Sequence, residues 1–148
     1  MDEQLKKPRV GVGVMILKNS EVLLGKRHED PEKADSELHG EGTWTMPGGK
    51  LEFQEGLEAC ARREVGEETG LVIKDLEIFS VSNDRVPDNH FITVGFLTTV
   101  AEGEPKRMEP DEITEWRWFS FDKLPENIFS PSRKMIKNYL AKKFYQED

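Results

Sequence analysis

The stretch that decides the fold is GKLEFQEGLEACARREVGEETGL, which runs from Gly49 to Leu71. Most of it predicts a helix from about Gly56 to Thr69, and within that helix Glu67 and Glu68 follow Glu64 by three and four residues. Because an α-helix repeats every 3.6 residues, this spacing places the three carboxylates on one side of the helix. The stretch therefore predicts an acidic helix face.

A helical wheel divides this helix into an inward stripe and a solvated side. The inward stripe contains Leu57, Cys60, Ala61 and Val65 together with Glu64 and Glu68, and the solvated side contains Glu55, Glu58, Arg62, Gly66 and Thr69. A Glu-rich helix is more often a solvated face, but here the other residues already supply that face. A carboxylate removed from water costs several kcal/mol unless it is paired or binds a cation. The pattern therefore predicts a divalent metal site.

Glycines flank the acidic helix on both sides. Pro47-Gly48-Gly49 predicts a turn whose backbone can approach a ligand closely. Thr69-Gly70 predicts a C-cap that ends the helix just after the acidic cluster. A ligand held by the carboxylates would therefore also lie beside the turn.

The spacing of these residues resembles the Nudix box of the Nudix hydrolases. Gly49, Glu55, Arg63-Glu64-Val65, Glu67-Glu68 and Gly70-Leu71 match every defining position. The likeness extends from about Val10 to about Leu124, and it is strongest to the MutT-like nucleoside triphosphate diphosphatases, which hydrolyse dNTPs and oxidised nucleotides. The resemblance implies an α/β fold, the Nudix-type α/β/α sandwich with a mixed β-sheet.

Length and composition indicate one compact domain, and the resemblance implies a single Nudix hydrolase domain over residues 1–148. The net charge of −8 argues against a general nucleic-acid binder, which needs a basic face. Divalent cations explain how an acidic protein binds phosphates. No apolar run approaches the ~18 residues that span a bilayer, and the first residues are no signal peptide. We expect a cytoplasmic protein without membrane contact.

Hydrophobic periodicity predicts a mixed α/β arrangement. The expected strands are Val10–Leu17, Val22–Lys26, Thr43–Met46, Leu71–Ser82, Phe91–Val100 and Glu115–Phe119, and a second helix is expected from Pro131 to about Tyr145. Residues Asn83 to His90 are expected to link two of the strands. The polar segment from His28 to Glu41 predicts a mobile loop that closes on a bound nucleotide as a lid, or alternatively a plain surface insertion.

The carboxylates suit the hydrolysis of a phosphoanhydride, which requires shielding of negative oxygens and an activated water. Mg²⁺, or Mn²⁺ in its place, takes oxygen ligands and keeps waters of its own. Glu64 and Glu68 are the expected ligands, Glu67 completes the set from the edge, and the resemblance adds the carbonyl of Gly48. Glu112, in the loop before the last strand, is a further candidate ligand.

Two catalytic roles accompany this metal site. The proton of the attacking water has three candidate acceptors, Glu67, Glu68 and, from outside the helix, Glu112. The resemblance implies that Arg63 orients the site through an ion pair with Glu52 or Glu55 and does not contact the substrate.

Substrate contacts are expected from cationic and apolar residues near the same rim. Arg27 and Lys50 are the candidates for phosphate binding, although surface Arg and Lys are usually solvated. Met46 and Phe53, with Phe91 and Phe129, offer stacking surface for a base, although such residues are more often simple core.

The sequence is consistent with three functional classes. The first is a nucleoside triphosphate pyrophosphohydrolase that releases a monophosphate and pyrophosphate, with a small nucleotide as its partner. The second hydrolyses ADP-ribose or a nucleotide sugar. The third is a non-catalytic Nudix-fold binding module, which the intact glutamates disfavour. A homodimer is common in the family that the chain resembles.

Overall fold

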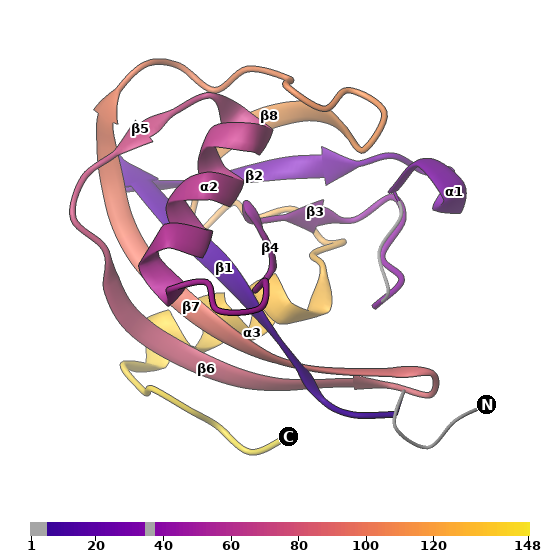
Figure 1. Ribbon diagram of the computed structural model, residues 1–148. Helices are drawn as coiled ribbons and strands as arrows, with labels where there is room; N and C mark the ends of the chain where they lie inside the picture. Colours follow the sequence, from indigo (N-terminus) through magenta and orange to yellow (C-terminus); the bar gives the residue numbers. More distant parts are fainter. Residues whose placement is uncertain (1–5, 35–37) are drawn as a thin grey trace.

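A computed structural model of the chain describes residues 6–34 and 38–148. In these residues it has eight strands and three helices arranged around one sheet (Figure 1). The strands are β1 (Arg9–Lys18), β2 (Glu21–Arg27), β3 (Trp44–Thr45), β4 (Gly48–Lys50), β5 (Val72–Ile73), β6 (Glu77–Val86), β7 (Asn89–Glu102) and β8 (Ile113–Ser120). The helices are α1 (Pro31–Ala34), α2 (Leu57–Thr69) and α3 (Ser130–Ala141).

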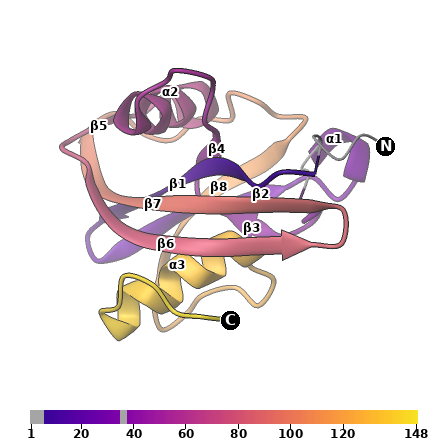
Figure 2. The same cartoon turned by 60° about the horizontal axis from the view of Figure 1, so that its bottom comes forward.

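Helices α2 and α3 cover opposite faces of the sheet (Figure 2). The long central pairing is parallel, between β1 and β7, and runs from Arg9 opposite Phe91 to Leu17 opposite Thr99. Antiparallel pairings add β6 and β5 to β7, and β3 and β8 to β2. The predicted α/β/α sandwich with a mixed sheet is therefore confirmed.

The sheet opens between β1 and β2, and this opening positions the site. The two strands pair only beside their connecting turn, where Leu17 faces Val22. Farther along, β1 pairs with β4, with Gly13 opposite Gly48, while β2 pairs with β3, with Gly25 opposite Thr45. The short β3–β4 segment therefore bridges two diverging strands.

Alternate residues of β1 supply the two halves of the core, as expected for a strand covered on both faces. Val12, Val14 and Ile16 pack with Cys60, Ala61 and Val65 of α2. Met15, on the other face, packs with Met135 and Ile136 of α3. Burial of these side chains holds both helices against the sheet.

Helix α2 confirms most of the predicted wheel, with one correction. Gly70 ends the helix in the left-handed region at φ 72° and donates its N–H to the carbonyl of Gly66. Thr69, which the wheel placed on the solvated side, is fully buried. It lies one turn after Val65, donates its hydroxyl to the Val65 carbonyl at 2.7 Å and accepts the N–H of Leu71.

Several predicted boundaries were wrong. The strand expected over Leu71–Ser82 is divided into β5 and β6, because Thr98 of β7 hydrogen-bonds the carbonyls of Lys74 and Asp75 between them. The expected link Asn83–His90 is mostly strand, with β6 and β7 forming a hairpin that turns at residues 87–88.

Two further corrections concern helix and turn limits. The C-terminal helix ends at Ala141, because Lys142 adopts the left-handed conformation at φ 55°. Gly48 and Gly49, predicted as part of a turn with Pro47, belong to strand β4, which pairs with β1.

The predicted lid is partly structured. Residues 31–34 form α1, and Ala34 is buried. Residues 35–37 of the same prediction lie outside the described residues. No helix within 6–34 and 38–148 is long and apolar enough to cross a membrane.

Candidate active site

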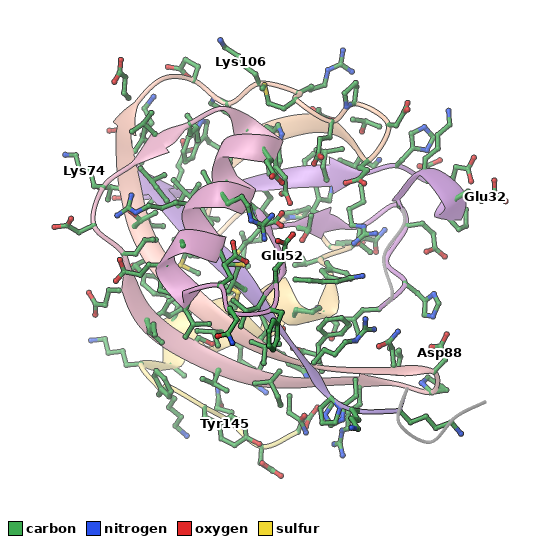
Figure 3. The ribbon with its side chains drawn as sticks, in the orientation of Figure 1. Glu32, Glu52, Lys74, Asp88, Lys106 and Tyr145 are labelled. Atoms are coloured by element: carbon green, nitrogen blue, oxygen red, sulfur yellow. The ribbon has the colours of Figure 1, made fainter. Side chains whose placement is uncertain are left out.

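A cavity of about 580 Å³ lies where β1 and β2 diverge. Its acidic side is formed by Glu64, Glu67 and Glu68 of α2, and its apolar side includes Phe91 and Met135. Glu52, on the segment between β4 and α2, lies beside the helix and also lines the cavity (Figure 3). The cavity therefore joins a charged side to an apolar one.

The two glutamates of the inward stripe lie against the glycines of β4. Glu68 accepts the N–H of Gly48 through Oε2 at 3.4 Å. A Cβ on Gly49 would lie 2.6 Å from both carboxylate oxygens of Glu64, so a larger residue there would displace Glu64. Glycines at this point allow the helix carboxylates to approach the strand.

Burial, and after it the charge of neighbouring carboxylates, raises the pKa values of the cavity glutamates. Burial, and then the charge of neighbouring Glu64, raises the pKa of Glu68 well above its usual range. Burial likewise raises the pKa of Glu64. Glu109, in the loop before β8, has a pKa raised by burial and by the charge of Glu67. A cation placed among these groups would relieve the repulsion.

Arg63 organises the acidic side from the outer edge of α2. Its Nε and Nη2 donate to the two carboxylate oxygens of Glu55 at 2.7 and 3.0 Å, and its Nη1 donates to Glu64 at 2.8 Å. These hydrogen bonds raise the pKa of Arg63 and lower that of Glu55 to about 2. Glu52 is farther away, at 3.9 Å, so Glu55 is the main partner.

The donor set suits a hard divalent cation. In the described parts of the chain, no three His, Cys, Asp or Glu side chains are grouped closely enough to hold a metal as they stand. Arg63 Nη1 contacts both Glu64 and Glu67, at 2.8 and 3.5 Å. Glu64 and Glu68 lie near enough for each to affect the pKa of the other, and two carboxylates with a backbone oxygen suffice for Mg²⁺, which keeps several waters.

Five of the six expected substrate residues line the cavity, Phe91 and Phe129 among them. Lys50 and Met46 line it, and so does Arg27, which is buried, donates to the Ala34 carbonyl at 3.0 Å and lies 4.8 Å over the Phe129 ring. Phe53 does not reach it. Phe53 is 93% exposed and lies in the segment after β4, next to Gln54 at φ 66°.

Some cavity residues were not found by sequence reasoning. Glu112 lines the cavity as expected, but Glu109, three residues earlier, lines it too. The hydroxyl residues Thr45, Thr93 and Ser132 also line it. Glu109 and Glu112 both precede the last strand, so this acidic pair could have identified Glu109 from the sequence. The hydroxyl residues stand in no recognisable sequence pattern.

Comparisons with known proteins agree with this geometry. The family model described as NUDIX domain matches residues 7–139. The chain is 36% identical to an ADP-ribose pyrophosphatase of Methanocaldococcus jannaschii, over 90% of this chain and 73% of the relative. It is 28% identical to the 8-oxo-dGTP diphosphatase of Escherichia coli, over 89% of this chain and 95% of that protein.

Longer relatives and a solved structure give the same family. The NAD-capped RNA hydrolase NudC of Pseudomonas aeruginosa is 33% identical over 86% of this chain, which spans only 45% of that relative. The crystal structure of a MutT NUDIX hydrolase from Burkholderia pseudomallei superposes with a TM-score of 0.79 at 30% identity, covering 89% of this chain and 98% of the other. The box residues of α2 line a cavity in this shared fold, and the chain belongs to the NUDIX-domain family of hydrolases.

Proposed function

We propose that this chain is a divalent-metal-dependent hydrolase that converts a nucleoside triphosphate, a dNTP or an oxidised dNTP, to the monophosphate and pyrophosphate. The observation that carries the proposal is the position of Glu64 and Glu68. Their carboxylates face the Gly48-Gly49 backbone on the acidic side of a cavity whose other side is apolar. A triphosphate fits the first side and a base fits the second.

Different residues of the chain are proposed to contact the phosphates, the base and the metal-binding carboxylates. Lys50 and Arg27 line the cavity and are the proposed phosphate contacts. Met46, Phe91 and Phe129 offer apolar surface to the base. Arg63 acts on the carboxylates, because its bidentate pair with Glu55 fixes the guanidinium that holds Glu64.

Glu64, Glu67 and Glu68, with the carbonyl of Gly48, are the proposed ligands of Mg²⁺ or Mn²⁺. When bound, the ion supplies charge shielding for the phosphate oxygens and lowers the pKa of the attacking water. Glu112 and Glu109 line the cavity from the loop before β8 and are, with Glu67 and Glu68, the proposed acceptors of the water's proton.

A second candidate substrate is ADP-ribose or a nucleotide sugar. It is favoured by the 36% identity to an ADP-ribose pyrophosphatase over 90% of the chain. The bond that is hydrolysed is of the same kind, because ADP-ribose also has a phosphoanhydride between two phosphorus atoms and carries one nucleobase. A homodimer and the organisation of residues 1–148 as one domain stay predictions.

An activity screen with Mg²⁺ separates these candidates. It compares dNTPs, 8-oxo-dGTP, ADP-ribose and nucleotide sugars, with products identified by chromatography. We expect a dNTP or an oxidised dNTP to give the highest kcat/KM; a higher value for ADP-ribose would favour the second candidate.

Hydrolysis in ¹⁸O-water then locates the broken bond. We expect release of pyrophosphate, with the label identifying the phosphorus that was attacked. Release of orthophosphate and a nucleoside diphosphate would contradict the proposed reaction.

A further inference from the structure

Three hydroxyl-bearing residues line the cavity, and each hydroxyl proton has an acceptor within the protein. They are Thr45, Thr93 and Ser132. Thr93 and Ser132 are buried, at 6% and 3% exposure. A hydroxyl has one proton to donate and two lone pairs that accept. Where the protein takes the proton, a ligand finds only an acceptor.

Thr93 gives its proton to a buried carboxylate. Its Oγ1 donates to Oδ2 of Asp84 at 2.6 Å, and Ser82 donates to the same oxygen at 2.8 Å. Lys134 Nζ lies 3.3 Å from the other oxygen, and Asp84 is only 3% exposed. The Asp84 oxygen accepts from both hydroxyls, so Thr93 is the donor in its hydrogen bond.

The hydroxyls of Ser132 and Thr45 are also engaged in hydrogen bonds within the protein. Ser132 Oγ accepts the N–H of Met46 at 2.9 Å, and Thr45 donates its hydroxyl to the Met46 carbonyl at 3.0 Å. The two hydroxyls are 3.3 Å apart. The geometry allows either hydroxyl to donate in that contact, and with the Thr45 proton on the Met46 carbonyl that role falls to Ser132. Both side chains therefore offer only lone pairs to the cavity.

Because the surroundings are apolar, the lack of an available hydroxyl proton affects which ligand groups can be satisfied. Met46, Phe91, Phe129 and Met135 line the same cavity. In such a place a donor on the ligand gains a hydrogen bond, whereas a carbonyl would face the lone pairs of a hydroxyl and stay unsatisfied. A site with fixed polar groups rejects the mismatched analogue strongly.

We propose that Thr45, Thr93 and Ser132 form an acceptor-only wall that selects a nucleobase with an exocyclic amino group over the base that carries a carbonyl in its place. The proposal rests on the proposed function only in that a nucleotide base occupies this side of the cavity. It holds equally for a triphosphate and for ADP-ribose.

The test compares kcat/KM within matched pairs, dATP with dITP and dCTP with dUTP, or ADP-ribose with its inosine analogue. We expect the wild-type protein to prefer the amino member of the better pair by at least about tenfold. Thr93→Val has the same shape without the hydroxyl and should lower that preference below about threefold. Thr93→Ser, which restores the hydroxyl, should recover it.

Ser82→Ala is the matched control. It removes the other hydroxyl that donates to the same Asp84 oxygen, but Ser82 does not line the cavity. We expect it to keep the amino preference. Ser132→Ala tests the second half of the wall and keeps the proposal testable if Thr93→Val does not fold, as judged by circular dichroism.

Three results would overturn the proposal. One is an equal or higher kcat/KM for the carbonyl members. Another is a wild-type preference that survives in both Thr93→Val and Ser132→Ala. The third is an equal loss in Ser82→Ala, which would show that the effect passes through Asp84 and not through a contact with the base.

Binding of dAMP and dIMP to the metal-free protein separates this proposal from the proposed reaction. We expect dAMP to bind at least about tenfold more tightly in isothermal titration calorimetry. If dAMP is preferred while no nucleotide is hydrolysed, the selectivity stands and the proposed reaction fails. If hydrolysis occurs and dIMP binds as well as dAMP, the reverse holds.

Discussion

The carboxylate of Glu68 lies 3.4 Å from the backbone nitrogen of Gly48, and this contact joins α2 to β4 at the acidic side of the cavity. One helical turn earlier, Glu64 lies against Gly49. Two glutamates one turn apart on the helix thus meet two adjacent glycines on the strand. The position of the proposed metal ligands therefore depends on the absence of side chains at Gly48 and Gly49 of β4.

Gly49→Ala should remove activity while leaving the protein folded. The new Cβ would lie 2.6 Å from both Glu64 carboxylate oxygens, so Glu64 must move. We expect kcat to fall by about 100-fold, the scale of losing one preorganised charged group. Gly66→Ala is the control, because a Cβ there meets nothing within 4 Å. It lies inside α2 and should stabilise the protein by about 0.5–1 kcal/mol in urea unfolding. Full activity in Gly49→Ala would contradict this account of β4.

Arg63→Lys should impair turnover even though it keeps the charge. A lysine cannot form the paired contacts to Glu55 at 2.7 and 3.0 Å while also holding Glu64. We expect at least about a tenfold loss of kcat and a loss of about 1–3 kcal/mol in the free energy of unfolding. Arg62→Ala is the neighbouring control, since Arg62 donates to the carbonyls of Ile73 and Lys74 on another side of α2. Equal loss of kcat in both variants would argue against a positioning role for Arg63.

The Glu55–Arg63 pair predicts a pH dependence of stability. The hydrogen bonds from Arg63 lower the pKa of Glu55 from 4.5 to about 2. Because the folded-state pKa is lowered, the stabilisation is complete above pH 4.5 and is lost as the pH falls through about 2. The difference in unfolding free energy between wild type and Glu55→Gln should be constant from pH 7 to pH 5 and shrink toward pH 3. A difference that grows on acidification would show that the pair is not stabilising.

Replacing residues 30–37 by a short Gly-Ser linker tests the segment after β2. The replacement removes the Ala34 carbonyl that accepts from buried Arg27 at 3.0 Å. If this contact holds Arg27 toward the phosphates, kcat/KM should fall, mainly through KM. Glu32→Ala, on the exposed side of α1, should change neither constant. Unchanged KM and kcat in the linker variant would mean that the segment is a plain surface insertion.

Most features of the fold and the site that could be predicted depend on residues close together in the sequence. The spacing of Glu64 and Glu68 and the cap at Gly70 lie within one short stretch, so helical periodicity was enough for them. The ion pair of Arg63 with Glu52 or Glu55 was an expectation from the family resemblance, and the structure makes Glu55 the main partner. Phe53 lies in the same stretch but after the strand, where backbone direction and not composition decides which way a side chain points.

Features that depend on distant partners could not be read from the sequence. Gly48 and Gly49 form a strand only because β1 supplies its hydrogen-bonding edge. Thr93 becomes an acceptor through Asp84 on the neighbouring strand. Glu109 reaches the acidic side because the loop before β8 brings it near Glu67. Each of these needs the tertiary structure.

The most direct test of the metal-dependent mechanism is the Mg²⁺ dependence of turnover in wild type and Glu68→Gln, with exposed Glu58→Gln as control. We predict no turnover by chelator-stripped wild type and recovery with Mg²⁺. Glu68→Gln should lose at least about 100-fold in kcat, and its Tm should not fall, because it removes a carboxylate crowded against Glu64. Near-normal turnover by pure Glu68→Gln, or by wild type without metal, would contradict the assignment.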